Sequence, residues 1–156
     1  MSQLFGERSW QIPNRMEPAI AMAREAMEWV ESFPISEQSK YSIRLTLEEM
    51  LSNTVKYGYD DSAEHLITIR IAADSELIRI ELMDDGHPFD PTRQATPDVE
   101  HRIEEGLIGG FGIELVRRLC KQMDYQREAD RNRTTLHIGI LDPDEFELND
   151  PQENRS

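Results

Sequence analysis

Residues 36–58 read SEQSKYSIRLTLEEMLSNTVKYG, and this stretch carries the pattern from which the fold can be worked out. Ser36 is a good helix N-cap and Gly58 a natural stop, so a helix is predicted over about residues 37–57. Its apolar stripe consists of Ile43, Leu47, Met50 and Thr54, with Leu51 beside it. A polar stripe lies roughly 120° away and so borders the core instead of facing bulk solvent. This second stripe holds Ser42, Thr46, Glu49, Asn53 and Lys56.

The residues before this helix predict one strand and one further helix. Residues 3–12 alternate loosely and stop at Pro13, as a strand would. From Asn14 the period changes to that of a helix, which is expected to end at Phe33-Pro34. Its apolar positions are Ile20, Ala23, Met27, Val30 and Phe33.

The residues after the helix predict a sheet with an insertion. Residues 66–73 and 77–83 are apolar, β-branched runs typical of a hairpin. Residues 87–106 hold three prolines and no clean period, which favours a functional lid. A third helix is then expected, with the stripe Ile113, Val116, Leu119/Cys120 and Met123, followed by short strands over 124–129 and 134–141. Helices on one face of a mixed, mostly antiparallel sheet make an α+β two-layer sandwich.

Composition limits the possible functions. The chain has 156 residues, with 17 Lys and Arg against 31 Asp and Glu, so its net charge is −14. This charge repels nucleic acid and anionic lipid, and no apolar run is long enough to span a membrane. With a single Cys120 and no signal-like N-terminus, a cytoplasmic protein is expected. We expect one domain over residues 1–141 and a mobile acidic tail over residues 142–156.

Three short segments could carry chemistry, although each also has a simple structural explanation. Glu49 and Asn53 lie one turn apart on a helix, which alone is typical of a solvated face. Asp84-Asp85-Gly86 follows a strand and is either an ordinary turn or a fixed carboxylate that accepts a hydrogen bond from an exocyclic amine such as that of adenine. Gly109-Gly110-Phe111-Gly112 opens a helix and is either a hinge or a set of backbone N–H groups that bind phosphate. Neither the Rossmann nor the P-loop spacing is present.

The order of the three segments along the chain resembles the GHKL (Bergerat) family of ATPases and kinases. Residues 47–59 resemble its N box, residues 84–91 its G1 box and residues 108–117 its G2 box. Within the family the chain is most similar to the bacterial anti-sigma-factor serine/threonine kinases of partner-switching systems. Tyr-Gly-Tyr after the N box and Pro-Phe-Asp-Pro after the G1 glycine favour that branch over the histidine kinases. His87-Pro88 departs from the G1 pattern, in which a second glycine often follows.

The resemblance implies a Bergerat-type sandwich and a role for each matching residue. Asn53 would supply an oxygen to Mg²⁺, and Glu49 would be the general base for an incoming hydroxyl. Lys56 would contact a phosphate of ATP. The adenine would be recognised by Asp84, with Gly86 and Thr134 beside it, and the lid glycines Gly109, Gly110 and Gly112 would surround the phosphates.

The resemblance also implies an activity and a set of partners. The expected function is an ATP- and Mg²⁺-dependent kinase that phosphorylates a STAS-type anti-anti-sigma protein and otherwise sequesters a sigma factor. A PP2C-type phosphatase in the same circuit and a homodimer are further expectations. Two alternatives are an ATP-binding regulatory module without phosphotransfer and an ATPase that drives a clamp. The presence of Glu49 favours the active kinase.

Overall fold

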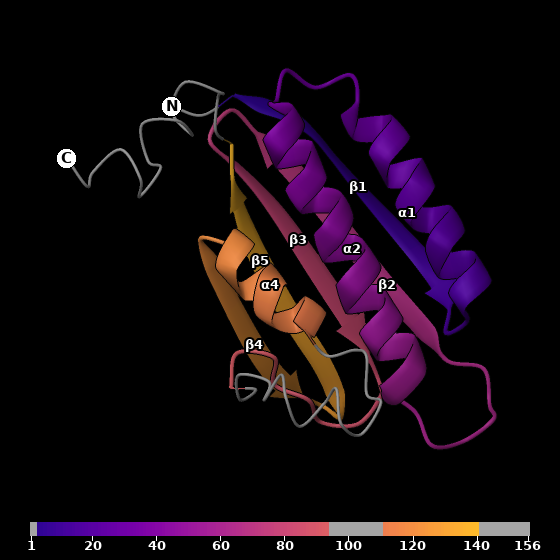
Figure 1. Cartoon of the computed structure of the whole chain (residues 1–156). Helices are drawn as coiled ribbons and strands as arrows, with labels where there is room; N and C mark the ends of the chain where they lie inside the picture. The colour runs from indigo at the N-terminus through magenta and orange to yellow at the C-terminus, as the bar shows by residue number, and fades with distance from the viewer. Residues whose placement is uncertain (1–2, 94–110, 141–156) are drawn as a thin grey trace.

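The computed structural model describes residues 3–93 and 111–140, which form eight labelled helices and strands (Figure 1). In chain order these are β1 (Leu4–Pro13), α1 (Met16–Val30), α2 (Glu37–Tyr57), β2 (Leu66–Asp74), β3 (Leu77–Asp84), α4 (Phe111–Leu119), β4 (Gln122–Glu128) and β5 (Arg131–Gly139). The expected lid beyond residue 93, including Gly109 and Gly110, and the acidic tail lie outside the described residues. No helix in the described ranges is long and apolar enough to cross a membrane.

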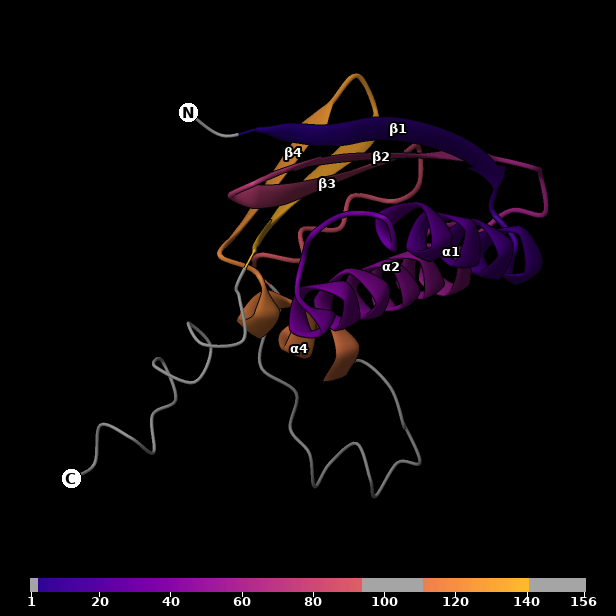
Figure 2. The same ribbon diagram turned by 90° about the horizontal axis from the view of Figure 1, so that it is seen from above.

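The strands form one sheet in the order β1-β2-β3-β5-β4, so β1 and β4 are its outer strands. Each neighbouring pair in this sheet is antiparallel. Figure 2 shows α1, α2 and α4 on the same side of the sheet. The predicted α+β two-layer sandwich is therefore confirmed, with antiparallel pairing throughout the described strands.

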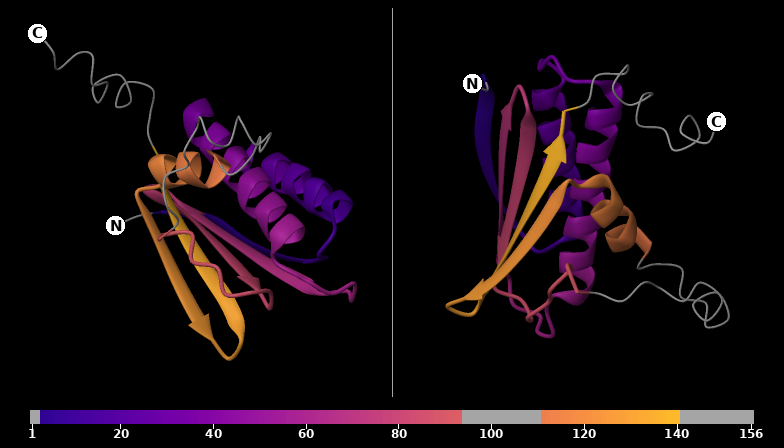
Figure 3. Two further views of the ribbon diagram at one scale, coloured as in Figure 1. Left: turned by 60° about the horizontal axis from the view of Figure 1, so that its bottom comes forward. Right: turned by 90° about the vertical axis from the view of Figure 1, so that its left-hand side faces the viewer.

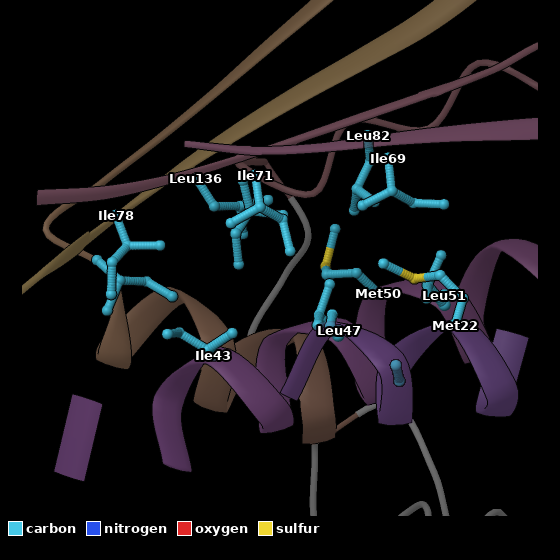
Figure 4. Close-up of a cluster of buried hydrophobic side chains, with 14 of the residues drawn as sticks. Met22, Ile43, Leu47, Met50, Leu51, Ile69, Ile71, Ile78, Leu82 and Leu136 are labelled. Carbon is cyan, nitrogen blue, oxygen red and sulfur yellow. The ribbon is translucent and has the colours of Figure 1, made fainter. Parts of the chain in front are cut away.

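The core lies between this sheet and the helices. Successive side chains of a strand point to opposite faces, so the alternating isoleucines of β2 and β3 all face the helical layer. Figure 4 shows side chains of α2 directed toward those of the sheet. Burying each such Leu or Ile contributes about 1.5–3 kcal/mol. The fully buried large side chains include Ile43, Leu47, Leu51, Ile69, Ile71, Ile78, Ile80 and Leu136.

The boundaries of α2 agree with the sequence prediction. It spans Glu37–Tyr57, and the Ser36 hydroxyl accepts a hydrogen bond from the Ser39 N–H at 3.1 Å. That bond satisfies one of the N–H groups left free at a helix start. α4 packs against α2 within the helical layer (Figure 3).

The boundaries and the buried face of α1 differ from the prediction. α1 ends at Val30, and the chain turns before Phe33. Ala23 and Val30 of the predicted stripe are buried, and Met27 and Phe33 are partly buried against the core. Ile20 is 53% exposed, because Ala19 and Met22 lie on the buried face instead. Small side chains dominate that face and let the helix lie close to its neighbours; its buried members are Ala19, Met22, Ala23, Ala26 and Val30.

The C-terminal hairpin also starts and turns at other residues than predicted. Met123 lies on β4 and not on the third helix, because α4 stops at Leu119. β5 begins at Arg131 instead of Thr134, directly after a turn in which Ala129 and Asp130 have φ of 52° and 60°. Such turns usually carry Asn-Gly or Asp-Gly, so this pair gave no turn signal.

Candidate functional site

The polar stripe of α2 runs from the core to solvent. Ser42 is 6% exposed and Thr46 fully buried, whereas Glu49 and Asn53 are half-buried and Lys56 is exposed. The prediction that this stripe borders the core is confirmed. Glu49 and Asn53 lie one turn apart, between the buried and the exposed ends of the stripe. A side chain in this position is ordered by its neighbours yet can still reach a ligand.

Glu49 lies directly against the first turn of α4. A Cβ atom built on Gly112 would overlap the Glu49 carboxylate and would come within 2.9 Å of its Cγ. Only glycine therefore fits at position 112 while Glu49 keeps this position. The N-terminal end of a helix carries positive partial charge, so it attracts the carboxylate that lies beside it.

Asp84 ends β3 as a buried carboxylate, with 8% of its surface exposed. Its Oδ1 accepts two hydrogen bonds, from the Gly86 N–H at 2.9 Å and from Asn132 Nδ2 at 2.9 Å. Within the described part of the chain no residue donates to its Oδ2. The carboxylate is thus held by one oxygen and has the other available to a ligand.

Thr134 shares the buried face with Asp84. It pairs with Leu82 across the β3–β5 ladder, while Asp84 pairs with Asn132, so Thr134 and Asp84 are diagonal neighbours on two adjacent strands. Thr134 is 6% exposed. Side chains in this relation lie close enough to contact one small ligand.

The end of α2 is joined to the turn that follows Asp84. The His87 N–H donates to the Gly58 carbonyl at 2.8 Å. A Cβ on Gly86 would lie 2.5 Å from that same oxygen and 3.0 Å from Asp84 Oδ1. Glycine is therefore required at position 86 by the close approach of the Gly58 backbone.

Two histidines connect the loop after α2 to the same turn. His65 contacts Asp61 through Nε2 at 2.8 Å and Asp85 through Nδ1 at 3.1 Å, and its ring stacks on Tyr59 with centroids 4.4 Å apart. His87 Nε2 lies 2.9 Å from Asp60. The hydrogen bond to Asp61 and, to a smaller extent, the hydrogen bond to Asp85 raise the pKa of His65 above its ordinary value.

Tyr59 follows α2 and stacks on His65. Its hydroxyl is buried without a hydrogen-bond partner among the described residues. Burial, and then the negative charge of Asp84 and Asp85, raise the pKa of Tyr59, so the hydroxyl stays protonated. An uncommitted O–H donor thus lies near the turn that holds Asp84.

Several of these residues were missed by the sequence reasoning. The sequence motifs gave His65 no role, and Thr134 was the residue of the C-terminal hairpin that they assigned to the site. Asn132 and Arg127 of the C-terminal hairpin reach the turn of residues 84–87 through side-chain hydrogen bonds, and the Tyr125 hydroxyl donates to Asn132. Only the Tyr-Gly-Tyr after α2 and the position of Asn132 two residues before Thr134 could have pointed to them.

The donor set at this end of the sheet fits a magnesium nucleotide. The half-buried Glu49 and Asn53 supply hard oxygen donors, which Mg²⁺ prefers. A buried carboxylate with a free oxygen suits an exocyclic amine. Among the predicted site residues, Glu49 lies against Gly112, and Asp84 accepts a hydrogen bond from the Gly86 N–H. Lys56 lies at the exposed end of the polar stripe of α2.

Comparisons with known proteins agree with this arrangement. The family model described as a histidine kinase-like ATPase domain matches residues 12–138. The serine/threonine-protein kinase BtrW of Bordetella bronchiseptica is 25% identical over 118 residues, which cover 73% of this chain and 83% of that protein.

Two solved structures share the fold. The RsbU and RsbW domains of Rv1364c from Mycobacterium tuberculosis match with a TM-score of 0.60 at 14% identity, over 88% of this chain and 33% of that one. The blue-light activated histidine kinase EL346 of Erythrobacter litoralis matches with a TM-score of 0.53 at 16% identity, over 78% of this chain and 40% of that one. The chain thus corresponds to a minor part of each solved chain.

Proposed function

Because the chain belongs to the histidine kinase-like ATPase domain family, we propose that it binds ATP with Mg²⁺ and transfers the γ-phosphate to a serine or threonine of a partner protein. Membership of this family, expected from the three motifs, implies ATP binding. The kinase activity, the roles of individual residues and the partners are parts of the proposal.

At the adenine end, the proposal assigns base recognition to Asp84. Its Oδ1 is held by the Gly86 N–H and by Asn132, so Oδ2 would accept a hydrogen bond from the adenine amine. Thr134, on the adjacent strand, would be a second contact. Gly86 keeps the backbone of this turn close to Gly58 and so keeps the wall of the site in place.

At the phosphate end, the half-buried Asn53 would give its amide oxygen to Mg²⁺, and Lys56 would contact a phosphate from the solvent side. Mg²⁺ would neutralise charge that develops on the transferred group. Gly112, together with Gly109 and Gly110, would offer backbone N–H groups to the phosphates.

Glu49 is the proposed general base, and its contact with Gly112 is the observation that carries the proposal. That contact places a carboxylate beside the glycine-rich start of α4, where phosphates are expected. A carboxylate there can take the proton from an incoming hydroxyl, a role typically worth about 10²–10⁴ in rate.

A groove next to Glu49 supports a protein as the acceptor. It lies between α1 and α2 with a volume of about 470 Å³, and Ile20, Leu47 and Glu49 are among its lining residues.

The partner is proposed to be a STAS-type anti-anti-sigma protein, in a cytoplasmic circuit with a sigma factor and a PP2C-type phosphatase. The kinase is proposed to be a homodimer. The likeness to BtrW and to an RsbW domain supports this choice. Residues 1–141 would form the single ATP-binding domain.

The direct test is phosphotransfer from labelled ATP to a candidate STAS protein. Wild type is expected to transfer label, and Glu49→Ala is expected to bind ATP without transfer. Glu28→Ala, on an exposed face of α1, is the control and should transfer normally. If wild type binds ATP and a cognate partner yet transfers no label, the kinase proposal is wrong. The protein would then be the alternative, an ATP-binding regulatory module without phosphotransfer.

A further inference from the structure

Asn132 is a buried amide whose hydrogen-bonding capacity is fully used. It is 5% exposed and pairs with Asp84 across the β3–β5 ladder. Its Nδ2 donates to Asp84 Oδ1 at 2.9 Å and to the His87 carbonyl at 2.7 Å. Its Oδ1 accepts from the Tyr125 hydroxyl at 2.5 Å and from Arg127 Nη1 at 3.1 Å. Two donors and two acceptors therefore fix this side chain.

These contacts also fix which way the amide points. Arg127 can only donate, and the His87 carbonyl can only accept, so a flipped amide would oppose donor to donor and acceptor to acceptor. The amide N–H therefore faces Asp84 in the only arrangement that satisfies all four partners.

The hairpin of β4 and β5 holds the Asp84 turn at further points. Arg127 Nη1 donates to the Gly86 carbonyl at 2.7 Å, next to the His87 carbonyl bound by Asn132. The side chain of Asp84 and the backbone carbonyls of Gly86 and His87 are thus bound to one hairpin. Asp84 cannot turn without breaking these contacts.

We propose that Asn132 is a positioning residue that orients Asp84 toward the amine of adenine and so sets the preference for adenine over a 6-oxo purine. The inference rests on the proposed nucleotide site. With the Asn132 and Gly86 donors both on Oδ1, Oδ2 is left to accept from the ligand. Without Asn132 the carboxylate loses one of its two donors and can rotate about its Cβ–Cγ bond.

The test compares ATP with inosine triphosphate, which has an oxo group in place of the amine. Dissociation constants of both are measured by calorimetry for the full chain and for Asn132→Ala, Asp84→Asn and the double variant. Asn132→Ala is expected to weaken ATP about tenfold and inosine triphosphate less than about twofold, since only the amine contact depends on Asp84. In the Asp84→Asn background, Asn132→Ala should have little further effect.

Two more variants separate positioning from packing. Asn132→Asp keeps the size of the side chain but removes its donor and adds like charge, so it should lower the ATP preference at least as much as Asn132→Ala. Tyr125→Phe removes one partner of Asn132 and should shift the preference in the same direction by a smaller amount. If Asn132→Ala does not fold, Asn132→Asp and Tyr125→Phe provide the test. Thr135→Ala, on the opposite face of β5, is the control and should leave both constants unchanged.

Equal weakening of both nucleotides, or additive effects in the double variant, would overturn the positioning role. A wild type that prefers ATP, with variants that keep this preference, would overturn the inference about Asn132 alone. A wild type that binds neither nucleotide would overturn the proposed function and the inference together.

Discussion

Replacing Gly112 with alanine tests the placement of Glu49 with the smallest possible change. The added Cβ would overlap the Glu49 carboxylate and lie 2.9 Å from its Cγ. The atoms in the way belong to the far end of a flexible, half-buried side chain, so Glu49 can swing aside. We therefore expect the protein to fold with its proposed general base displaced.

The expected magnitudes for Gly112→Ala follow from this displacement. Phosphotransfer should fall by about 10²–10⁴, as for loss of a general base. Stability should change little, because alanine in place of glycine within α4 favours the helix by about 1 kcal/mol and a strained Glu49 rotamer costs about 0.5–1.5 kcal/mol. The melting temperature is expected to stay within about 4 °C of wild type.

The assay is transfer of label from ATP to the partner, with thermal denaturation in parallel. In a Glu49→Ala background the same change should add nothing, because the clash has gone. Gly6→Ala, where the nearest atoms to the added Cβ belong to Phe33 and Trp29 at 3.1 Å, is the control and should transfer normally. A folded Gly112→Ala that transfers at the wild-type rate would refute the placement of Glu49 as the base.

Three further predictions concern the walls of the site. The hydrogen bonds to Asp61 and then to Asp85 raise the pKa of His65 above its ordinary 6.5, and the hydrogen bond to His65 lowers the pKa of Asp61 below its ordinary 3.8. The contribution of the pair to stability should therefore be present between these two ordinary values and be lost as pH rises through the raised pKa of His65. Melting curves should accordingly show His65→Ala more destabilised relative to wild type at about pH 5 than at about pH 8, and a difference independent of pH would contradict this reading. Gly86→Ala should lower the free energy of unfolding by about 1–3 kcal/mol, measured in urea, because its Cβ would lie 2.5 Å from the Gly58 carbonyl, which is backbone and cannot move aside; unchanged stability would mean that the turn is free to shift. Asn53→Ala should abolish the dependence of ATP affinity on Mg²⁺ in calorimetry, and an unaltered dependence would remove Asn53 from the metal site.

Much of the fold was predictable because its signals are local. The ends of α2 follow from Ser36 and Gly58, which act on their own neighbourhood. β2 and β3 follow from alternating isoleucines, since one face of each strand is buried. On α1, Ile20 was wrongly placed on the buried face, because the small side chain of Ala19 gave the sequence pattern less weight than the bulkier Ile20.

The site was predictable in part. Glu49, Asn53 and Asp84 stand in a recognisable order, and family membership agrees with that reading. Their surroundings were not predictable, because the contacts of Asn132 with Asp84 and of Gly112 with Glu49 join residues far apart in the chain. Such contacts depend on strand register and helix packing, which the local sequence pattern does not specify.

The two outer strands of the sheet bear on how the protein avoids aggregation. An outer strand is a template to which a foreign strand can add, and natural proteins block it with charge, irregular pairing or proline. β1 has a register shift between Leu4 and Gly6 and ends at Pro13, and β4 reads QMDYQRE with charge along its length. Both margins are thus poor templates for strand addition, which protects the protein against edge-to-edge association. Addition of an extended peptide to either edge of the sheet is disfavoured for the same reason.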